Sequence, residues 1–178
     1  MSITDRAEHD PVASAILITP SKELARAVDR AIQDQLAKLN RGDIARQSLR
    51  SYGALMVVPD LDAGIDLANR IAPEHLELQV AEPFTRIGQI RHAGAIFIGS
   101  HTPEPIGDYI AGPNHVLPTA GTARFSSPLS VDVFMKKTSL IHYAPSAFKR
   151  EAADVLELAH IEGLDAHAQS IQIRLDRL

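Results

Sequence analysis

The sequence contains no cysteine and no tryptophan, and aromatic residues make up only 4% of its 178 residues. Without cysteine, a disulfide framework, a thiolate zinc site and a cysteine nucleophile are all excluded. Any metal must therefore be held by nitrogen and oxygen ligands. Because aromatic side chains are so few, alanine, leucine, isoleucine and valine must build the hydrophobic core.

A strongly basic surface and a long apolar run are also missing. The formal net charge is −4, and charges of both signs are interspersed along the chain, which argues against a nucleic-acid partner. No apolar run approaches the length of a membrane span, and the polar opening MSITDRAEHDP has no apolar core for a signal peptide. We therefore expect a soluble, cytoplasmic protein with no membrane partner.

Short apolar segments of strand length alternate with segments whose apolar residues recur every three or four positions. This alternation predicts an α/β fold with a mostly parallel sheet and flanking helices. Thr19-Pro20 is interpreted as the cap and first turn of the first helix. The predicted strands are residues 15–19, 54–58, 76–80, 95–98 and 139–143. The first predicted helix runs from Pro20 to residue 39, and the others cover residues 43–49, 61–71, 84–90 and 146–159.

Residues 99–128 differ in character, with five prolines and no periodicity. Their isoleucine, valine, leucine and aromatic content argues against disorder, so we interpret them as an ordered loop that forms a site. The predicted organisation is a partial α/β domain over residues 1–144, which carries this loop, and a helical carboxy-terminal arm over residues 145–178.

Glu74 and His75 follow Pro73, which should end the preceding helix and place both side chains at the mouth of a strand. An adjacent carboxylate and imidazole can supply two proton-transfer groups. The alternative is a capping glutamate beside an exposed histidine.

Asp108 and His115 share the glycine-punctuated loop, and a carboxylate with an imidazole suits zinc or manganese. Two groups are too few for a catalytic zinc site, which usually has three protein ligands. An Asx turn and a surface histidine explain the same residues equally well. Glu162, His167 and His9, taken alone, are typical of exposed polar positions.

Other catalytic patterns are absent. No Gly-x-Gly-x-x-Gly and no phosphate loop occurs, and Ser126-Ser127 lacks the glycines of a hydrolase nucleophile elbow.

Taken together, several segments resemble histidinol dehydrogenases, in the same order and over nearly the whole chain. GPNHVLPT and PEHL are the most specific among them. The segments are AEHDP at 7–11, APEHLEL at 72–78, AGAIFIG at 93–99, GDYIAGPNHVLPT at 107–119, ARFSSPLSV at 123–131 and HIEGLDAHAQSIQIRL at 160–175.

The resemblance implies an incomplete Rossmann-like fold and a family reaction, the oxidation of L-histidinol to L-histidine in histidine biosynthesis with zinc and two NAD molecules. It implies that Glu74 activates water and that His75 is the general base. The terminal arm of the family reaches into the neighbouring subunit, which implies a homodimer. The implied zinc ligands are His9, Asp108 and His167, and the implied substrate-binding residues are His75, Asp108, His115, Glu162 and His167.

Two departures from the family qualify this expectation. Arg6 stands where the family has a fourth zinc ligand, a glutamine, and a guanidinium cannot ligate zinc. Full-length members are also much longer, and most of their NAD site lies in the part without a counterpart here. We therefore expect a truncated, dehydrogenase-like protein that does not complete the reaction alone, and assign it no NAD-binding residue. One half of a split dehydrogenase, a non-catalytic binding module for zinc or an imidazole ligand, and a poorly folding gene remnant are the alternatives.

Overall fold

The computed structural model describes Thr4 and residues 7–178. The chain forms two compact units, Met1–Phe134 and Met135–Leu178.

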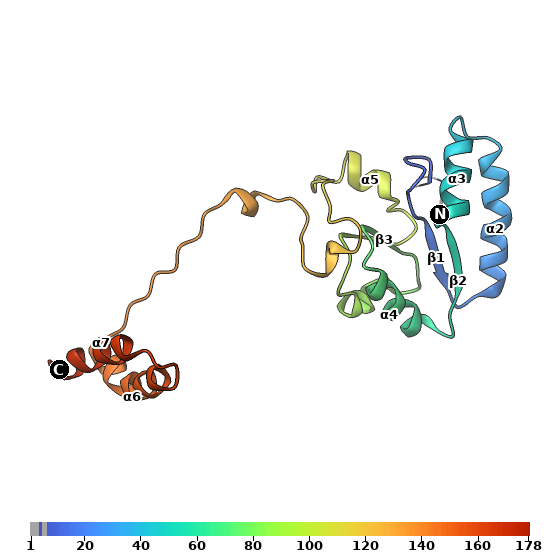
Figure 1. Cartoon of the computed structure of the whole chain (residues 1–178). Coiled ribbons are helices and arrows are strands. Elements are labelled where there is room, and N and C mark those ends of the chain that lie inside the picture. Colours follow the sequence, from blue (N-terminus) through green and yellow to red (C-terminus); the bar gives the residue numbers. More distant parts are fainter. Residues whose placement is uncertain (1–3, 5–6) are drawn as a thin grey trace. The chain divides into compact units, whose positions relative to one another are not determined.

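The first unit is an α/β structure built on two pairs of parallel strands (Figure 1). β1 pairs with β2, and β3 pairs with β4, so the predicted α/β class with parallel strands is confirmed. Helix α2 packs against β1 and β2, and α4 packs against β1. The elements are β1 (Ile16–Thr19), α2 (Lys22–Leu36), α3 (Gly42–Tyr52), β2 (Ala54–Val57), α4 (Leu61–Ile71), β3 (His75–Leu78), β4 (Ala95–Ile98) and α5 (Glu104–Tyr109), with 3-10 turns at Pro83–Thr85, Ile87–Gln89, Thr122–Arg124 and Val131–Phe134.

The first helix begins later than Thr19-Pro20 predicts. Ser21 is the N-cap, and its hydroxyl accepts a hydrogen bond from the Leu24 amide at 3.1 Å. Thr19 instead accepts from the Ser21 amide at 3.1 Å, so it stabilises the turn before the helix. The predicted cap at Thr19 was wrong because Ser21 caps the first turn instead, and serine is preferred over threonine at the N-cap.

Two further predicted elements are not formed. Residues 84–90 fold as two short 3-10 turns rather than one helix, and residues 139–143 form no strand. Spacing of three fits a 3-10 turn as well as an α-helix. An apolar run becomes a strand only where a partner strand lies beside it, and the described residues offer none there.

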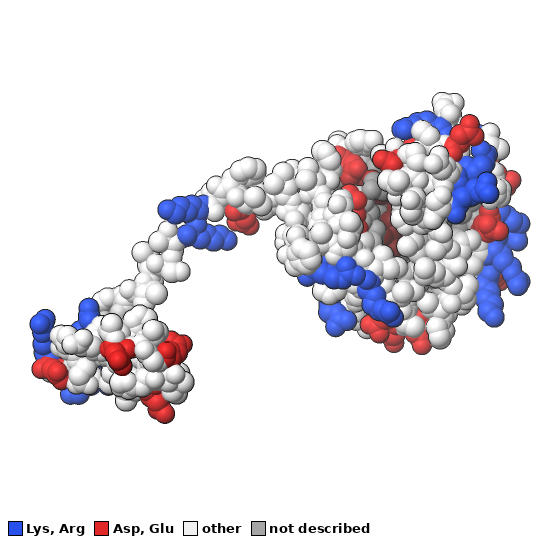
Figure 2. Space-filling model, viewed as in Figure 1, with Lys and Arg blue, Asp and Glu red and all other residues white. Residues whose placement is uncertain are grey.

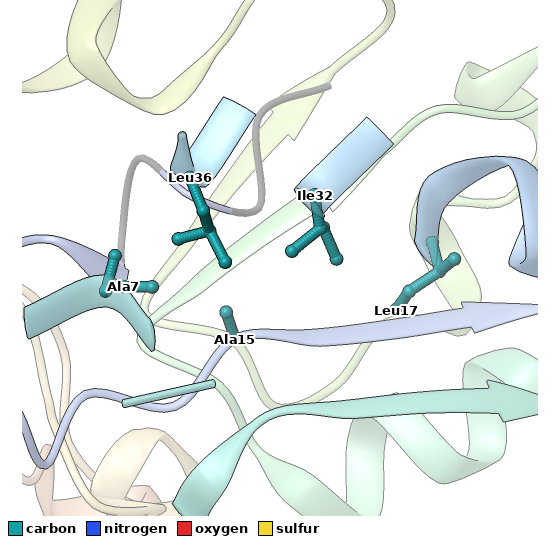
Figure 3. Close-up of a cluster of buried hydrophobic side chains, with 6 residues drawn as sticks. Ala7, Ala15, Leu17, Ile32 and Leu36 are labelled. Atoms are coloured by element: carbon teal, nitrogen blue, oxygen red, sulfur yellow. The ribbon is translucent and has the colours of Figure 1, made fainter. Parts of the chain in front are cut away.

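The principal core lies between α2, α3 and β1, as Figure 3 shows. Small and aliphatic side chains build it, as the shortage of aromatic residues predicts. Ala7 is fully buried in this cluster, which anchors the segment that carries His9. The buried members are Ala7, Ala15, Leu17, Ile32, Leu36 and Ala45.

The second unit is a pair of helices, α6 (Pro145–Ile161) and α7 (Asp165–Leu175), which pack together. Their buried side chains are Ala152, Ala159 and Ala168, so the helical carboxy-terminal portion is confirmed. Residues 135–144, which precede α6, form neither helix nor strand and are exposed throughout. Among the described residues, no helix is both long and apolar enough to cross a membrane.

Candidate active site

One face of the β3–β4 pair carries the polar side chains of the site. Successive strand residues point to opposite faces, so His75 and Glu77 share one face of β3. In the parallel register His75 lies beside Ala95 and Glu77 beside Phe97. The His75 ring lies 5.7 Å from the Phe97 ring, with 32° between the planes. Phe97 therefore supports the imidazole from the neighbouring strand.

Helix α5 closes over this face because it has a glycine where it approaches Phe97. A Cβ atom at Gly107 would lie only 2.5 Å from Cε1 of Phe97, so no larger residue fits without displacement. Glu104 and Asp108 are four residues apart and lie on one side of the helix. That side is turned to His75, as the distances below show.

His75 lies among three carboxylates. Its Nδ1 atom is 3.8 Å from Oε1 of Glu74. Its Nε2 atom is 3.8 Å from Oε1 of Glu104 and 3.9 Å from Oδ1 of Asp108. The imidazole is 8% exposed and the Glu104 side chain 4%, whereas Asp108 is 23% and Glu74 29% exposed. The carboxylates can stabilise a positive charge on the imidazole, and Glu74, the most exposed of the three, is best placed to meet water.

Three of these residues, His75, Glu104 and Asp108, form a group that could hold a metal ion. One ligand atom each from His75, Glu104 and Asp108 lies within 4.8 Å of the others. All are nitrogen or oxygen donors, which zinc accepts. Glu104 is absent from the residues predicted from sequence. Glu104 and Asp108 are four residues apart, a spacing that places two side chains on one side of a helix. Residues 99–128 were interpreted as a loop, in which this spacing predicts nothing.

A cavity of about 300 Å³ lies beside this cluster. It is lined both by α5 and by the segment near the amino terminus. Asp108 and His9, two of the predicted zinc ligands, both line it. The Arg41 guanidinium donates to the His9 carbonyl at 3.4 Å and so ties this segment to the start of α3. Figure 2 shows a hollow in the first unit with acidic side chains around it. The lining residues are Glu8, His9, Arg41, Glu104, Pro105, Asp108 and Tyr109.

The backbone before His75 is held firmly in place. Ala72, fully buried, has a left-handed backbone with φ of 52°, a conformation that costs about 1–2 kcal/mol for a residue with a Cβ atom. It turns the chain sharply from α4 into Pro73. The Gly94 amide then donates to the Pro73 carbonyl at 2.9 Å, and the Ala95 amide donates to the Glu74 carbonyl at 2.8 Å. These bonds fix the register of β3 against β4 at the point where Glu74 leads into the strand that His75 begins.

The structure does not bring every predicted site residue together. His115 is exposed in the first unit, and its neighbour Asn114 forms an Asx-type bond to the Val116 amide at 2.7 Å. Glu162 and His167 are exposed in the second unit, where Glu162 ends α6 and His167 lies in α7. Arg6 lies outside the described residues.

Known proteins of one family match nearly the whole chain. Residues 1–175 match the family model for histidinol dehydrogenase. The chain is 56% identical to the histidinol dehydrogenase of Oleidesulfovibrio alaskensis over 170 residues, which are 96% of this chain and 39% of that protein. It is 55% identical to the enzyme of Heliobacterium mobile, with coverage of 96% and 40%.

A solved structure extends this agreement to the fold. The crystal structure of histidinol dehydrogenase from Elizabethkingia anophelis superposes with a TM-score of 0.88 at 31% identity, and the match covers 98% of this chain and 40% of that one. The chain thus spans about two fifths of the length of the relatives it matches. It belongs to the histidinol dehydrogenase family.

Proposed function

We propose that this chain carries the proton-transfer part of a histidinol dehydrogenase active site. The reaction is the zinc-dependent, NAD-linked oxidation of L-histidinol to L-histidine, which the chain does not complete alone. The position of His75 among Glu74, Glu104 and Asp108 beside an open cavity carries this proposal. The second part is supported by coverage, because the chain spans only 39% of the length of the Oleidesulfovibrio alaskensis enzyme.

His75 is the general base for the alcohol in this proposal. Oxidation of an alcohol needs a base for the hydroxyl proton, and NAD, when bound, would supply the hydride acceptor. The surrounding carboxylates stabilise the imidazolium that forms. Glu74, the most exposed of the three acidic groups, activates the water that adds at the aldehyde stage. The buried Glu104 holds the imidazole orientation, and the cavity admits the substrate.

Asp108 and His9 are proposed zinc ligands in the first unit, since both line the same cavity. His167 is the proposed third ligand. A bound zinc ion supplies orientation and polarisation of the substrate and no electrons. His75, Asp108, His115, Glu162 and His167 are the proposed contacts to the substrate.

We further propose that a homodimer supplies Glu162 and His167, with the helical arm of one copy completing the site of another. Large apolar side chains support this assembly, because monomers rarely leave so many exposed in one stretch of chain. Leu140 is 95% exposed and Ile141 85%, with Val131, Val133 and Phe134 nearby in the sequence at 66–78%. Light scattering should give a dimer across a concentration range, and a clean monomer would contradict the proposal. We also propose a cytoplasmic location and no nucleic-acid partner.

The deciding experiment measures NADH formation from L-histidinol by the zinc-loaded chain, alone and with the remaining amino-terminal part of a histidinol dehydrogenase. We expect no turnover alone and turnover on addition of that part. His75→Ala should abolish it, and cooperative thermal unfolding of the variant is the control that it still folds. Asp108→Ala should lower the zinc stoichiometry. Turnover by the chain alone would overturn the claim of incompleteness, and activity in His75→Ala would overturn the assigned base.

A non-catalytic zinc or imidazole-ligand binding module is the second candidate. The clustering of metal-type donors in a chain that spans two fifths of its relatives favours it. Calorimetry would then show zinc and histidinol binding, yet no added amino-terminal part would produce turnover.

A further inference from the structure

We propose that Glu77 is the positioning residue of this site: its carboxylate caps the amino-terminal end of α5 from β3 and so sets Glu104 and Asp108 against His75. The inference rests on the proposed function, because it assigns the cluster around His75 to catalysis.

The geometry places Glu77 between the strand and the helix. It lies two residues after His75 and therefore projects from the same face of β3. Its Oε1 atom accepts a hydrogen bond from the Glu104 amide at 3.3 Å. Its Oε2 atom accepts one from Nε2 of Gln79 at 2.7 Å, which holds the carboxylate in that orientation.

Helix α5 needs such a contact because it lacks a cap of its own. The residue at its N-cap position is Pro103, which forms no side-chain hydrogen bond to the first turn. The first amides of a helix have no partner within the helix, and α5 has only six residues over which to stabilise itself. A carboxylate at this end satisfies an amide and interacts favourably with the helix dipole.

The cap and the glycine contact act at different points of α5. Gly107 against Phe97 holds the middle of the helix on the sheet. Glu77 fixes the first turn, where Glu104 is buried with its carboxylate 3.8 Å from Nε2 of His75. Without the cap, the first turn should fray while α5 stays attached through Gly107. Glu104 then leaves the imidazole first, and Asp108, one turn later, shifts less.

Hydrogen exchange in the zinc-free chain tests the cap, with Glu77→Ala, Glu77→Gln and Asp66→Ala compared by NMR. Asp66 is an exposed carboxylate of α4 in the same unit and serves as the charge control. In Glu77→Ala, the Glu104 and Ile106 amides should exchange about tenfold faster, as expected for a lost cap, and the ring resonances of His75 should shift. Glu77→Gln keeps a carbonyl acceptor and should restore most of the protection.

Zinc affinity of the same variants gives the second measurement. We expect Glu77→Ala to bind zinc about fivefold to tenfold more weakly, with Glu77→Gln near the wild type. If the wild-type chain binds no zinc, the zinc assignment fails, while exchange and ring resonances still decide the role of Glu77. Unchanged exchange in Glu77→Ala, or equal loss in Glu77→Gln, overturns the proposal. If Glu77→Ala does not fold, Glu77→Asp replaces it, and its shorter carboxylate should give intermediate protection.

Discussion

Gly107→Ala separates two opposing effects in α5. Alanine is favoured over glycine inside a helix by about 1 kcal/mol, which alone would stabilise the protein. The new Cβ atom, however, would lie 2.5 Å from Cε1 and 2.9 Å from Cζ of Phe97, whose side chain is buried. Carbon atoms pack at about 3.5–4.0 Å, so α5 must move by about 1 Å. Overpacking of this kind costs about 1–3 kcal/mol.

The rigid, buried ring puts the cost at the upper end of that range, so we expect Gly107→Ala to lower the free energy of unfolding by about 2 kcal/mol net. Urea unfolding followed on amide resonances of the first unit measures this without the transition of the second. The displaced helix also carries Glu104 and Asp108 away from His75, so zinc affinity should fall together with stability.

Two further variants control this experiment. Gly88 has nothing within 4 Å of a Cβ atom, and Gly88→Ala should change stability by less than about 0.5 kcal/mol. Phe97→Leu removes the ring edge, so the double variant with Gly107→Ala should be less destabilised than the sum of the single changes, with coupling of about 1–2 kcal/mol. A Gly107→Ala protein more stable than the wild type would refute the close approach of α5 to Phe97.

Asn69→Ala removes three hydrogen bonds of a buried side chain, whose Nδ2 donates to the Gln89 carbonyl and whose Oδ1 accepts from the Arg91 and His92 amides. The change should destabilise the first unit by about 2–3 kcal/mol in urea unfolding, and a loss below about 1 kcal/mol would contradict the buried network. Tyr143→Phe should raise the pKa of Glu151. Two hydrogen bonds lower this pKa below its ordinary 4.5, first that from the Tyr143 hydroxyl and then that from Arg150. Because that pKa is lowered in the folded state, the stabilisation is present above pH 4.5 and lost as pH falls below it, and carboxyl NMR of both proteins checks the shift.

The α/β fold was predictable because its signals are local. The apolar spacing after Pro20 and the run at residues 54–58 each predict an element from neighbouring residues. The elements that failed lack such a signal or depend on a partner. Residues 139–143 carry a strand-like composition, but a strand needs a neighbour for its amides and carbonyls, and sequence does not say whether one is present.

The site divides in the same way. The motifs and the family resemblance single out Glu74, His75 and Asp108, and the structure places the two carboxylates 3.8 and 3.9 Å from the imidazole. Neither the motifs nor the resemblance singles out Glu104, because its place beside His75 depends on Gly107 letting α5 approach Phe97 and on Glu77 reaching the Glu104 amide. Each of these contacts joins residues that are distant in sequence, so no spacing within one segment indicates them.

His9 shows how packing turns a polar surface residue into a candidate ligand. Nothing in AEHDP alone distinguishes it from any exposed histidine. Ala7, two residues earlier, is fully buried against α2, and the Asp10 side chain accepts a bond from the Val12 amide at 2.9 Å. The chain between them has little freedom, and Arg41 ties its backbone from the other side. Burial of the Ala7 methyl group therefore helps to place His9 at the cavity that Asp108 also lines.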